Sequence, residues 1–337
     1  MSGSATIQTD QFSSTLRSKA IDTDARRLLI TNLRGTGQES DLSVPPNCGG
    51  FGRVRHFRRA TDPGWPPNPL PIDPAVRSLG LERTDVLRAQ AFQNAACNWR
   101  CWYCFVPFEL LAAKSKYSSW LSAGDLLDLY QAEADRPVVI DLTGGQPDLT
   151  PEWIPWMMEE LVKRGLQDDI FLWSDDNLSN DYYFRFLTEP QRELVANFDK
   201  YARVCCFKGF SAESFSFNTR AAPDLFDRQF DVFRRLLAEG IDLYAYATFT
   251  TPKAAFIAED MARFVDRLQG ISENLPLRTV LLKIVVYSTV TGRVGAVQED
   301  ALVHQERALE AWLRELQRRY TTNILEQAIA DITQVAL

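Results

Sequence analysis

From residue 86 onward, short apolar runs alternate with stretches of helical periodicity. Six runs are typical of buried strands and lie at residues 86–92, 138–142, 170–173, 204–207, 243–248 and 280–287. The alternation predicts a parallel β/α domain, whose functional loops follow the carboxyl ends of its strands. The periodicity is equally compatible with an open doubly wound sheet and with a full or partial barrel.

Three helices are predicted from apolar spacing and end signals. Thr150 and Pro151 are typical of an N-cap and a first-turn proline, and Gly165 ends that helix. A second helix ends at Gly240, and a third lies near the C-terminus. Their apolar positions are Phe226, Phe230, Phe233 and Leu237 for the second helix, and Leu309, Leu313, Leu316 and Tyr320 for the third.

The first 84 residues have a different composition. Eight of the 17 prolines precede residue 80, and the segment also carries Arg53, Arg55, Arg58 and Arg59. We therefore expect residues 1–84 to form an extension that wraps or caps a core at 85–290, followed by a helical segment at 291–337. Its arginines are compatible with a solvated surface or with a lid that faces an anionic ligand.

Composition narrows the functional class. The chain has 337 residues, 45% of them apolar, a net charge of −7 and only two histidines, which excludes a wholly disordered chain and leaves little room for imidazole catalysis. No charge block points to a membrane surface or a nucleic-acid partner, and we expect neither. The N-terminus lacks a signal-peptide pattern, so we expect a cytoplasmic protein.

Three of the six cysteines lie within eight residues, directly after the first predicted strand. Cys97, Cys101 and Cys104 form a CxxxCxxC pattern. Thiolates so grouped predict a metal centre, either zinc or an iron–sulfur cluster. Zinc needs a fourth ligand, for which the remote Cys48 is a candidate. A cubane on three cysteines would instead leave one iron open to a substrate or cofactor.

The cysteine pattern, with the aromatic Tyr103 before its third cysteine, resembles the radical S-adenosylmethionine (radical SAM) superfamily. A second segment, residues 143–147 (Thr-Gly-Gly-Gln-Pro), follows the second predicted strand. It is similar to the GGE(P) motif of that family, which holds the methionyl amino group of SAM. Gln146 replaces the glutamate, so the resemblance implies an amide contact in place of a carboxylate contact.

Two more strand ends resemble the family. Ser174 and Asp175 stand where relatives have a polar segment that contacts the methionyl or ribose part of SAM. Lys208 matches a lysine of the glycyl-radical-enzyme activases, which implies pairing with the SAM carboxylate. Cys206 stands where those activases have an aspartate, so their arrangement there does not carry over.

Taken together, the resemblance implies a partial (β/α)6 barrel of the TIM type with an activase-like core. The cofactors implied are one [4Fe-4S] cluster on the three cysteines, which are also the catalytic residues, and SAM. The cofactor-binding residues implied are Tyr103, Gly144, Gly145, Gln146, Pro147, Ser174, Asp175 and Lys208.

The implied reaction is reductive cleavage of SAM to a 5′-deoxyadenosyl radical that abstracts hydrogen from a substrate C–H bond. The implied partners are an electron donor such as flavodoxin or ferredoxin and a small-molecule or protein substrate. Two alternatives stay open. One is a non-redox zinc-binding β/α protein, and the other is a radical SAM-like protein that binds without turnover, which Gln146 favours.

Overall fold

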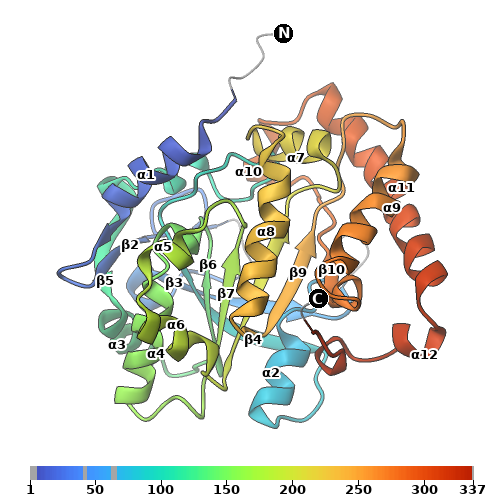
Figure 1. Ribbon diagram of the computed structural model, residues 1–337. Helices are drawn as coiled ribbons and strands as arrows, with labels where there is room; N and C mark the ends of the chain where they lie inside the picture. The colour runs from blue at the N-terminus through green and yellow to red at the C-terminus, as the bar shows by residue number, and fades with distance from the viewer. Residues whose placement is uncertain (1–5, 41–43, 62–66, 336–337) are drawn as a thin grey trace.

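The computed structural model describes residues 6–40, 44–61 and 67–335, and its main sheet has seven strands (Figure 1). In chain order these strands are β3 (Gly52–Arg58), β4 (Val86–Gln93), β6 (Val139–Thr143), β7 (Phe171–Asp176), β8 (Tyr201–Phe207), β9 (Leu243–Ala247) and β10 (Thr279–Leu281). Their order across the sheet is β10-β9-β8-β7-β6-β4-β3. All neighbours are parallel except β3 and β4, which are antiparallel. The predicted parallel β/α sheet is confirmed.

The sixth predicted strand is much shorter than expected. Residues 280–287 were expected to be extended, but β10 ends at Leu281. Beyond it the chain turns toward the C-terminal helical segment, since the Ile284 N–H donates to Gln305 Oε1 at 2.7 Å and Lys283 pairs with Glu306 at 2.7 Å. These contacts outside the sheet replace the strand pairing that the apolar sequence predicts.

Helices follow the strands along the chain. They are α3 (Ala123–Ala132), α4 (Trp153–Lys163), α5 (Tyr182–Phe186), α6 (Glu189–Ala196), α7 (Ala212–Thr219), α8 (Leu225–Ala238), α9 (Ile257–Gln269), α10 (Ser288–Thr291), α11 (Ala296–Arg319) and α12 (Thr322–Leu325). The three predicted helices are confirmed as α4, α8 and α11. The expected cap at Thr150 is wrong, because α4 begins only at Trp153 and the Thr150 hydroxyl accepts a hydrogen bond from Asn94 at 2.8 Å.

Short 3-10 turns complete the chain path: η1 (Cys48–Gly50), η2 (Phe108–Leu111), η3 (Ser115–Tyr117), η4 (Pro147–Leu149), η5 (Leu275–Arg278) and η6 (Ile329–Asp331). Within the described ranges, no helix combines the length and the apolar character that crossing a membrane requires.

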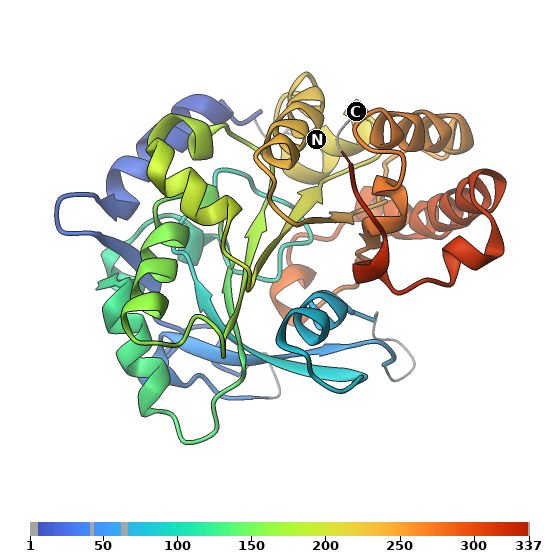
Figure 2. The same cartoon turned by 60° about the horizontal axis from the view of Figure 1, so that its bottom comes forward.

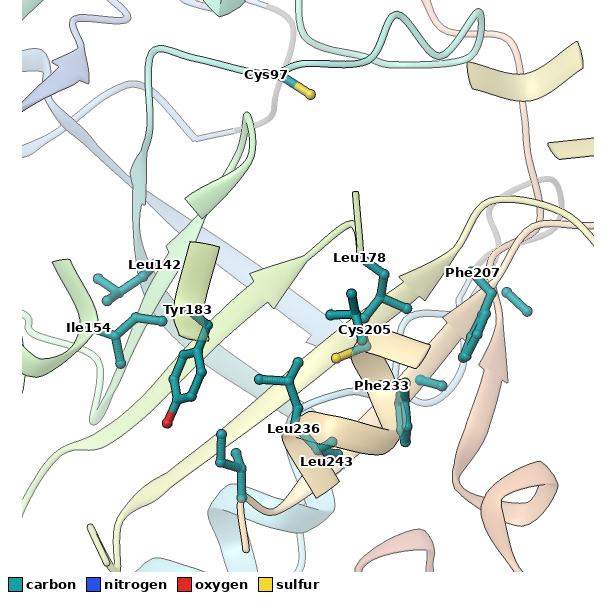
Figure 3. Packing of buried hydrophobic residues seen from close by; sticks show 14 of the residues in the cluster. Cys97, Leu142, Ile154, Leu178, Tyr183, Cys205, Phe207, Phe233, Leu236 and Leu243 are labelled. Atoms are coloured by element: carbon teal, nitrogen blue, oxygen red, sulfur yellow. The ribbon is translucent and has the colours of Figure 1, made fainter. Parts of the chain in front are cut away.

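Each strand presents alternate side chains to two different cores, as a two-residue period requires. On the outer face, helices α3, α4, α8 and α9 pack against the sheet, and Figure 3 shows Leu142, Cys205 and Leu243 in this layer with Phe233 and Leu236 of α8. The inner face carries a second cluster, whose members include Val139, Trp173, Val204, Cys206 and Tyr244. Figure 2 shows the curved sheet with α2 (Ile72–Leu79) inside the curve, where Ile72 and Ala75 belong to this second cluster.

The N-terminal segment supplies more than a covering. Its α1 (Thr9–Ala20), β1 (Ile21–Asp22) and β2 (Arg27–Thr31) precede β3, and β2 pairs with β5 (Ser118–Ser122) in a small antiparallel sheet. β3 itself is the edge strand of the main sheet. We did not predict this strand, because proline and glycine surround it. Its charged residues are compatible with an edge position.

Candidate functional site

The cysteine loop runs from β4 to η2 along the carboxyl end of the sheet. Its backbone is tied to distant elements. The Cys97 N–H donates to Leu111 O at 3.1 Å, and the Trp102 N–H donates to Asn218 O on α7 at 3.2 Å. Cys97 is buried, whereas Cys101 and Cys104 are half-buried. The loop is therefore a packed part of the fold on which thiols of differing exposure are held.

The three thiols influence one another electrostatically. The pKa of Cys101 is raised to about 12, mainly by burial, which Lys208 opposes and to which Cys104 and Cys97 add. Burial also raises the pKa of Cys104, with Cys97 adding to the shift. A metal centre bound at Cys101 and Cys104 would therefore have to displace protons from thiols whose pKa is raised.

Cationic groups surround the cysteine loop. The Arg100 side chain donates to Cys97 O at 2.5 Å, and Arg293 donates to Cys104 O at 2.7 Å. Three thiols enclosed by cations fit a thiolate-bound iron–sulfur cluster in their donor chemistry, since the cations offset the charge of the thiolates. Among the described residues, no set of three His, Cys, Asp or Glu side chains is arranged to hold a metal ion, so the ligand assignment stays a prediction.

The glycine turn is pressed against the cysteine loop. Gly144 and Gly145 have φ values of +66° and +61°, in the left-handed region that favours glycine. A Cβ on Gly145 would lie 2.3 Å from Ala96 O, and one on Gly144 would lie 2.4 Å from Gln93 Cγ. The Gln146 N–H also donates to Ala96 O at 2.7 Å. The close approach that these glycines permit is thus to the chain leading into Cys97.

Gln146 points into the protein interior. Its side chain is fully buried, its Nε2 donates to Asp176 Oδ1 at 2.7 Å, and its Oε1 accepts from the Asn177 N–H at 2.9 Å. Pro147, the next residue, is also buried and opens η4. We expected a contact between the Gln146 amide and SAM, but in this arrangement both ends of the amide are engaged by β7 and the residue after it.

Ser174 and Asp175 lie on opposite faces of β7. The Ser174 hydroxyl is fully buried on the outer face and hydrogen-bonds to Tyr201 Oη at 2.8 Å. Asp175 lies on the inner face, where it accepts a hydrogen bond from the Thr143 hydroxyl. Burial raises the pKa of Asp175, and Arg55 opposes that shift. Of these two residues, only Asp175 therefore lies on the inner face of the sheet.

Lys208 follows β8 and lies near the cysteine loop. Burial lowers its pKa, but Cys206, Tyr103 and Cys101 raise it by more, so the side chain retains its charge. Tyr103 in turn hydrogen-bonds to Thr248 Oγ1 at 3.1 Å. Lys208, Tyr103 and the loop cysteines thus lie close together.

An inner-face network that the sequence did not predict lies next to this place. Arg55 Nη1 donates to Asp141 Oδ2 at 2.7 Å and lies 3.4 Å from Thr143 Oγ1, which donates to Asp175. Two signals could have revealed it. One is the alternating Arg53-Val54-Arg55 stretch, and the other is an aspartate inside the apolar run at 138–142.

Helix α1 covers the outside of the cysteine loop, a contact that the sequence did not predict. Asn98 Nδ2 donates to Ser13 Oγ at 2.8 Å, and Trp99 Nε1 donates to Thr9 Oγ1 at 3.3 Å. The Arg100 guanidinium lies 4.8 Å from the ring of Phe12. The Ser and Thr residues near the N-terminus are therefore contacts of the loop.

The other cysteines lie in different surroundings. Cys48 lies in η1, where its N–H donates at 2.7 Å to Oε1 of Glu133, the residue after α3. Burial, and to a lesser extent Glu133, raises the pKa of Cys48 to about 12. Cys205 is buried on the outer face, and Cys206 is buried on the inner face near Lys208. The largest influences on the pKa of Cys101 and Cys104 are burial, the other loop cysteines and nearby groups such as Lys208.

No family model matches the sequence, and no curated protein is similar to it in sequence. In structure, the chain is similar to SuiB from Streptococcus suis bound to S-adenosylmethionine, with a TM-score of 0.48, 16% identity and coverage of 68% of this chain and 47% of SuiB. For SuiB bound to its precursor peptide SuiA the values are 0.46, 18%, 68% and 46%.

A third similar structure is TsrM, a radical S-adenosylmethionine methyltransferase from Kitasatospora setae, with a TM-score of 0.35, 17% identity and coverage of 52% of this chain and 33% of TsrM. The chain thus spans less than half the length of each of these three proteins. Because all three TM-scores lie below 0.5, the functional inference rests on the residues of this chain.

Proposed function

We propose that this chain is a radical SAM enzyme with the partial (β/α)6 barrel of that family. The observation that carries the proposal is the contact between its two motifs. The glycine turn lies against the chain that leads into Cys97, with the Gln146 N–H 2.7 Å from Ala96 O. Two sequence motifs separated by about 40 residues thus lie side by side at the carboxyl ends of the strands, where a cluster and SAM would have to lie together.

In this proposal Cys97, Cys101 and Cys104 would hold a [4Fe-4S] cluster, beside which SAM would bind. When bound, the cluster and SAM would supply the one-electron reductive cleavage of SAM that leads to hydrogen abstraction from a substrate C–H bond, with methionine and 5′-deoxyadenosine as products.

The chain's own residues bind and orient SAM. The turn at Gly144 and Gly145 offers backbone groups to the methionyl amino group, and Lys208 retains a charge that pairs with the carboxylate. Asp175 and Tyr103 lie beside this position, on the inner face and the cysteine loop. Pro147, Ser174 and Gln146 support the turn and the strand from buried positions.

The proposal includes partners and a location. The electron must come from a reductant such as flavodoxin or ferredoxin, in the cytoplasm. The substrate is a small molecule or a protein, and the enzyme belongs to an activase-like or small-molecule-modifying class. The proposal places one cluster on the three cysteines of the loop.

Anaerobic purification with cluster reconstitution tests the proposal. We expect a brown protein with about four irons per chain. Its EPR signal after reduction should change when SAM is added, and dithionite with SAM should yield 5′-deoxyadenosine. Colourless protein with one zinc ion per chain would contradict the proposal in favour of a zinc site. A fully clustered protein that binds SAM without forming 5′-deoxyadenosine would contradict it in favour of a binding role.

A further inference from the structure

Gln146 is a residue at which this chain departs from the radical SAM pattern, and its surroundings explain that departure. The side chain is fully buried between the glycine turn and the end of β7. Its Nε2 donates to Asp176 and its Oε1 accepts from the Asn177 N–H. A side chain at this position must therefore donate at one end and accept at the other, which an amide does and a carboxylate does not.

Asp176 is the reason why the side chain at position 146 has to donate a hydrogen bond. Its Oδ1 accepts from Gln146 Nε2 at 2.7 Å and from the Leu178 N–H at 2.8 Å, and its Oδ2 lies 3.7 Å from Arg203 Nη1. Asp148 lies 3.0 Å from the same Nη1 and contacts Asp176 directly. A glutamate at 146 would place a third carboxylate in this buried group, within hydrogen-bond distance of Asp176.

Asn177 extends the connection to the cysteine loop. Its Nδ2 lies 3.9 Å from Cys97 Sγ and donates to Asn98 Oδ1 at 3.2 Å. The path from the glycine turn through Gln146 and Asn177 to Cys97 consists of buried side chains. These contacts hold the glycine turn at a fixed distance from Cys97, the first cysteine of the loop.

We propose that Gln146 is a positioning residue, which fixes the glycine turn relative to Cys97 through Asp176 and Asn177, and that Asp176 is the reason why glutamine replaces glutamate in this chain. Its effect on SAM binding rests on the proposed function. The coupling between Gln146 and Asp176 does not, because it is a property of the folded chain alone.

The test compares the wild-type protein with Gln146→Glu, Asp176→Asn, the double variant and Gln317→Glu, a control that adds the same charge at an exposed position of α11. Iron content and SAM dissociation constant are measured on the reconstituted proteins, and urea unfolding midpoints on the metal-free proteins. We expect Gln146→Glu to bind SAM about tenfold more weakly or worse, because it brings like charges together in a buried site. Asp176→Asn in the same chain should restore affinity to within about threefold, because it removes one of those charges.

Unchanged SAM affinity in Gln146→Glu, with unchanged unfolding, would overturn the inference. An equal loss with and without Asp176→Asn would also overturn it, because the two residues would then not be coupled. If Gln146→Glu does not fold, Asn177→Ala probes the other end of the path, and we expect it to shift the EPR signal of the reduced cluster. An unshifted signal would overturn the link to Cys97. Failure of the proposed function is recognised separately, as a wild-type protein without iron whose urea midpoints still show the coupling.

Discussion

Arg55 on β3 donates a hydrogen bond of 2.7 Å to Asp141 on β6, reaching across β4, the strand between them. The crossing is possible because β4 carries Ala89 and Ala91 on this face, and small side chains leave room for the guanidinium. A residue of the N-terminal segment thus takes part in the inner-face network next to the candidate site.

This pair predicts a pH dependence of stability. The pKa of Asp141 is raised to about 8, mainly by burial, which Arg55 opposes and to which Asp175 adds. The folded state therefore binds a proton more tightly than the unfolded state, in which an aspartate has a pKa of about 3.9. The contribution of Asp141 to stability must then fall as the pH rises from about 4 toward 8.

Asp141→Asn removes this titration. Urea unfolding of metal-free protein between pH 5 and 8 should show a stability loss in the wild type that is reduced in Asp141→Asn. Asp300→Asn, at an exposed position of α11, should keep the wild-type profile. An unreduced loss in Asp141→Asn would show that other groups cause the pH dependence.

The glycine turn predicts a difference between two glycines of similar backbone conformation. Gly145 and Gly165 have φ values of +61° and +66°, but a Cβ on Gly165 meets nothing within 4 Å, whereas one on Gly145 meets Ala96 O. Gly165→Ala should cost about 1 kcal/mol from its backbone conformation alone. Gly145→Ala should cost about 1–3 kcal/mol more, because of the steric collision.

Urea denaturation of the two variants measures this difference. Gly145→Ala should also lower iron retention after reconstitution, because the collision displaces the chain leading into Cys97. Equal unfolding free energies for the two variants would contradict the close packing of the turn against the loop.

The cysteine loop predicts which thiols retain iron. Cys101→Ala should abolish iron retention, because it removes one of three proposed ligands. Cys48→Ala, which changes a cysteine packed against α3, should keep the iron of the wild type. Iron and sulfide analysis after reconstitution measures both, and an equal loss in the two variants would show that the ligand assignment is wrong.

The position of Lys208 predicts that its substitution weakens SAM binding and leaves iron binding unchanged. Lys208→Met keeps the length of the side chain but removes the charge that pairs with the SAM carboxylate in the proposal. SAM affinity, measured by equilibrium dialysis, should fall about tenfold or more at unchanged iron content. Lys253→Met, which changes an exposed lysine, should bind SAM as the wild type does. Loss of iron in Lys208→Met would instead show that the cysteine loop needs Lys208 to hold its iron.

Local patterns predicted much of the β/α domain. The apolar runs that became β4, β6, β7, β8 and β9 were found within a few residues, because parallel strands buried on both faces have a continuous apolar signature. β3 and the early end of β10 could not be found in this way. The first is an edge strand rich in arginine, and the second ends where contacts with the C-terminal helical segment replace strand pairing.

By itself the sequence determined that the chain folds as a parallel β/α domain and that three cysteines and a glycine pair follow two of its strands. Only the tertiary structure decided which side chains meet. In the folded sheet Ser174 and Asp175 lie on opposite faces. Gln146 donates a hydrogen bond to Asp176, and Arg55 donates one to Asp141. The physical reason is that periodicity is local, whereas hydrogen bonds between buried polar groups join residues far apart in the chain and depend on the register and curvature of the whole sheet.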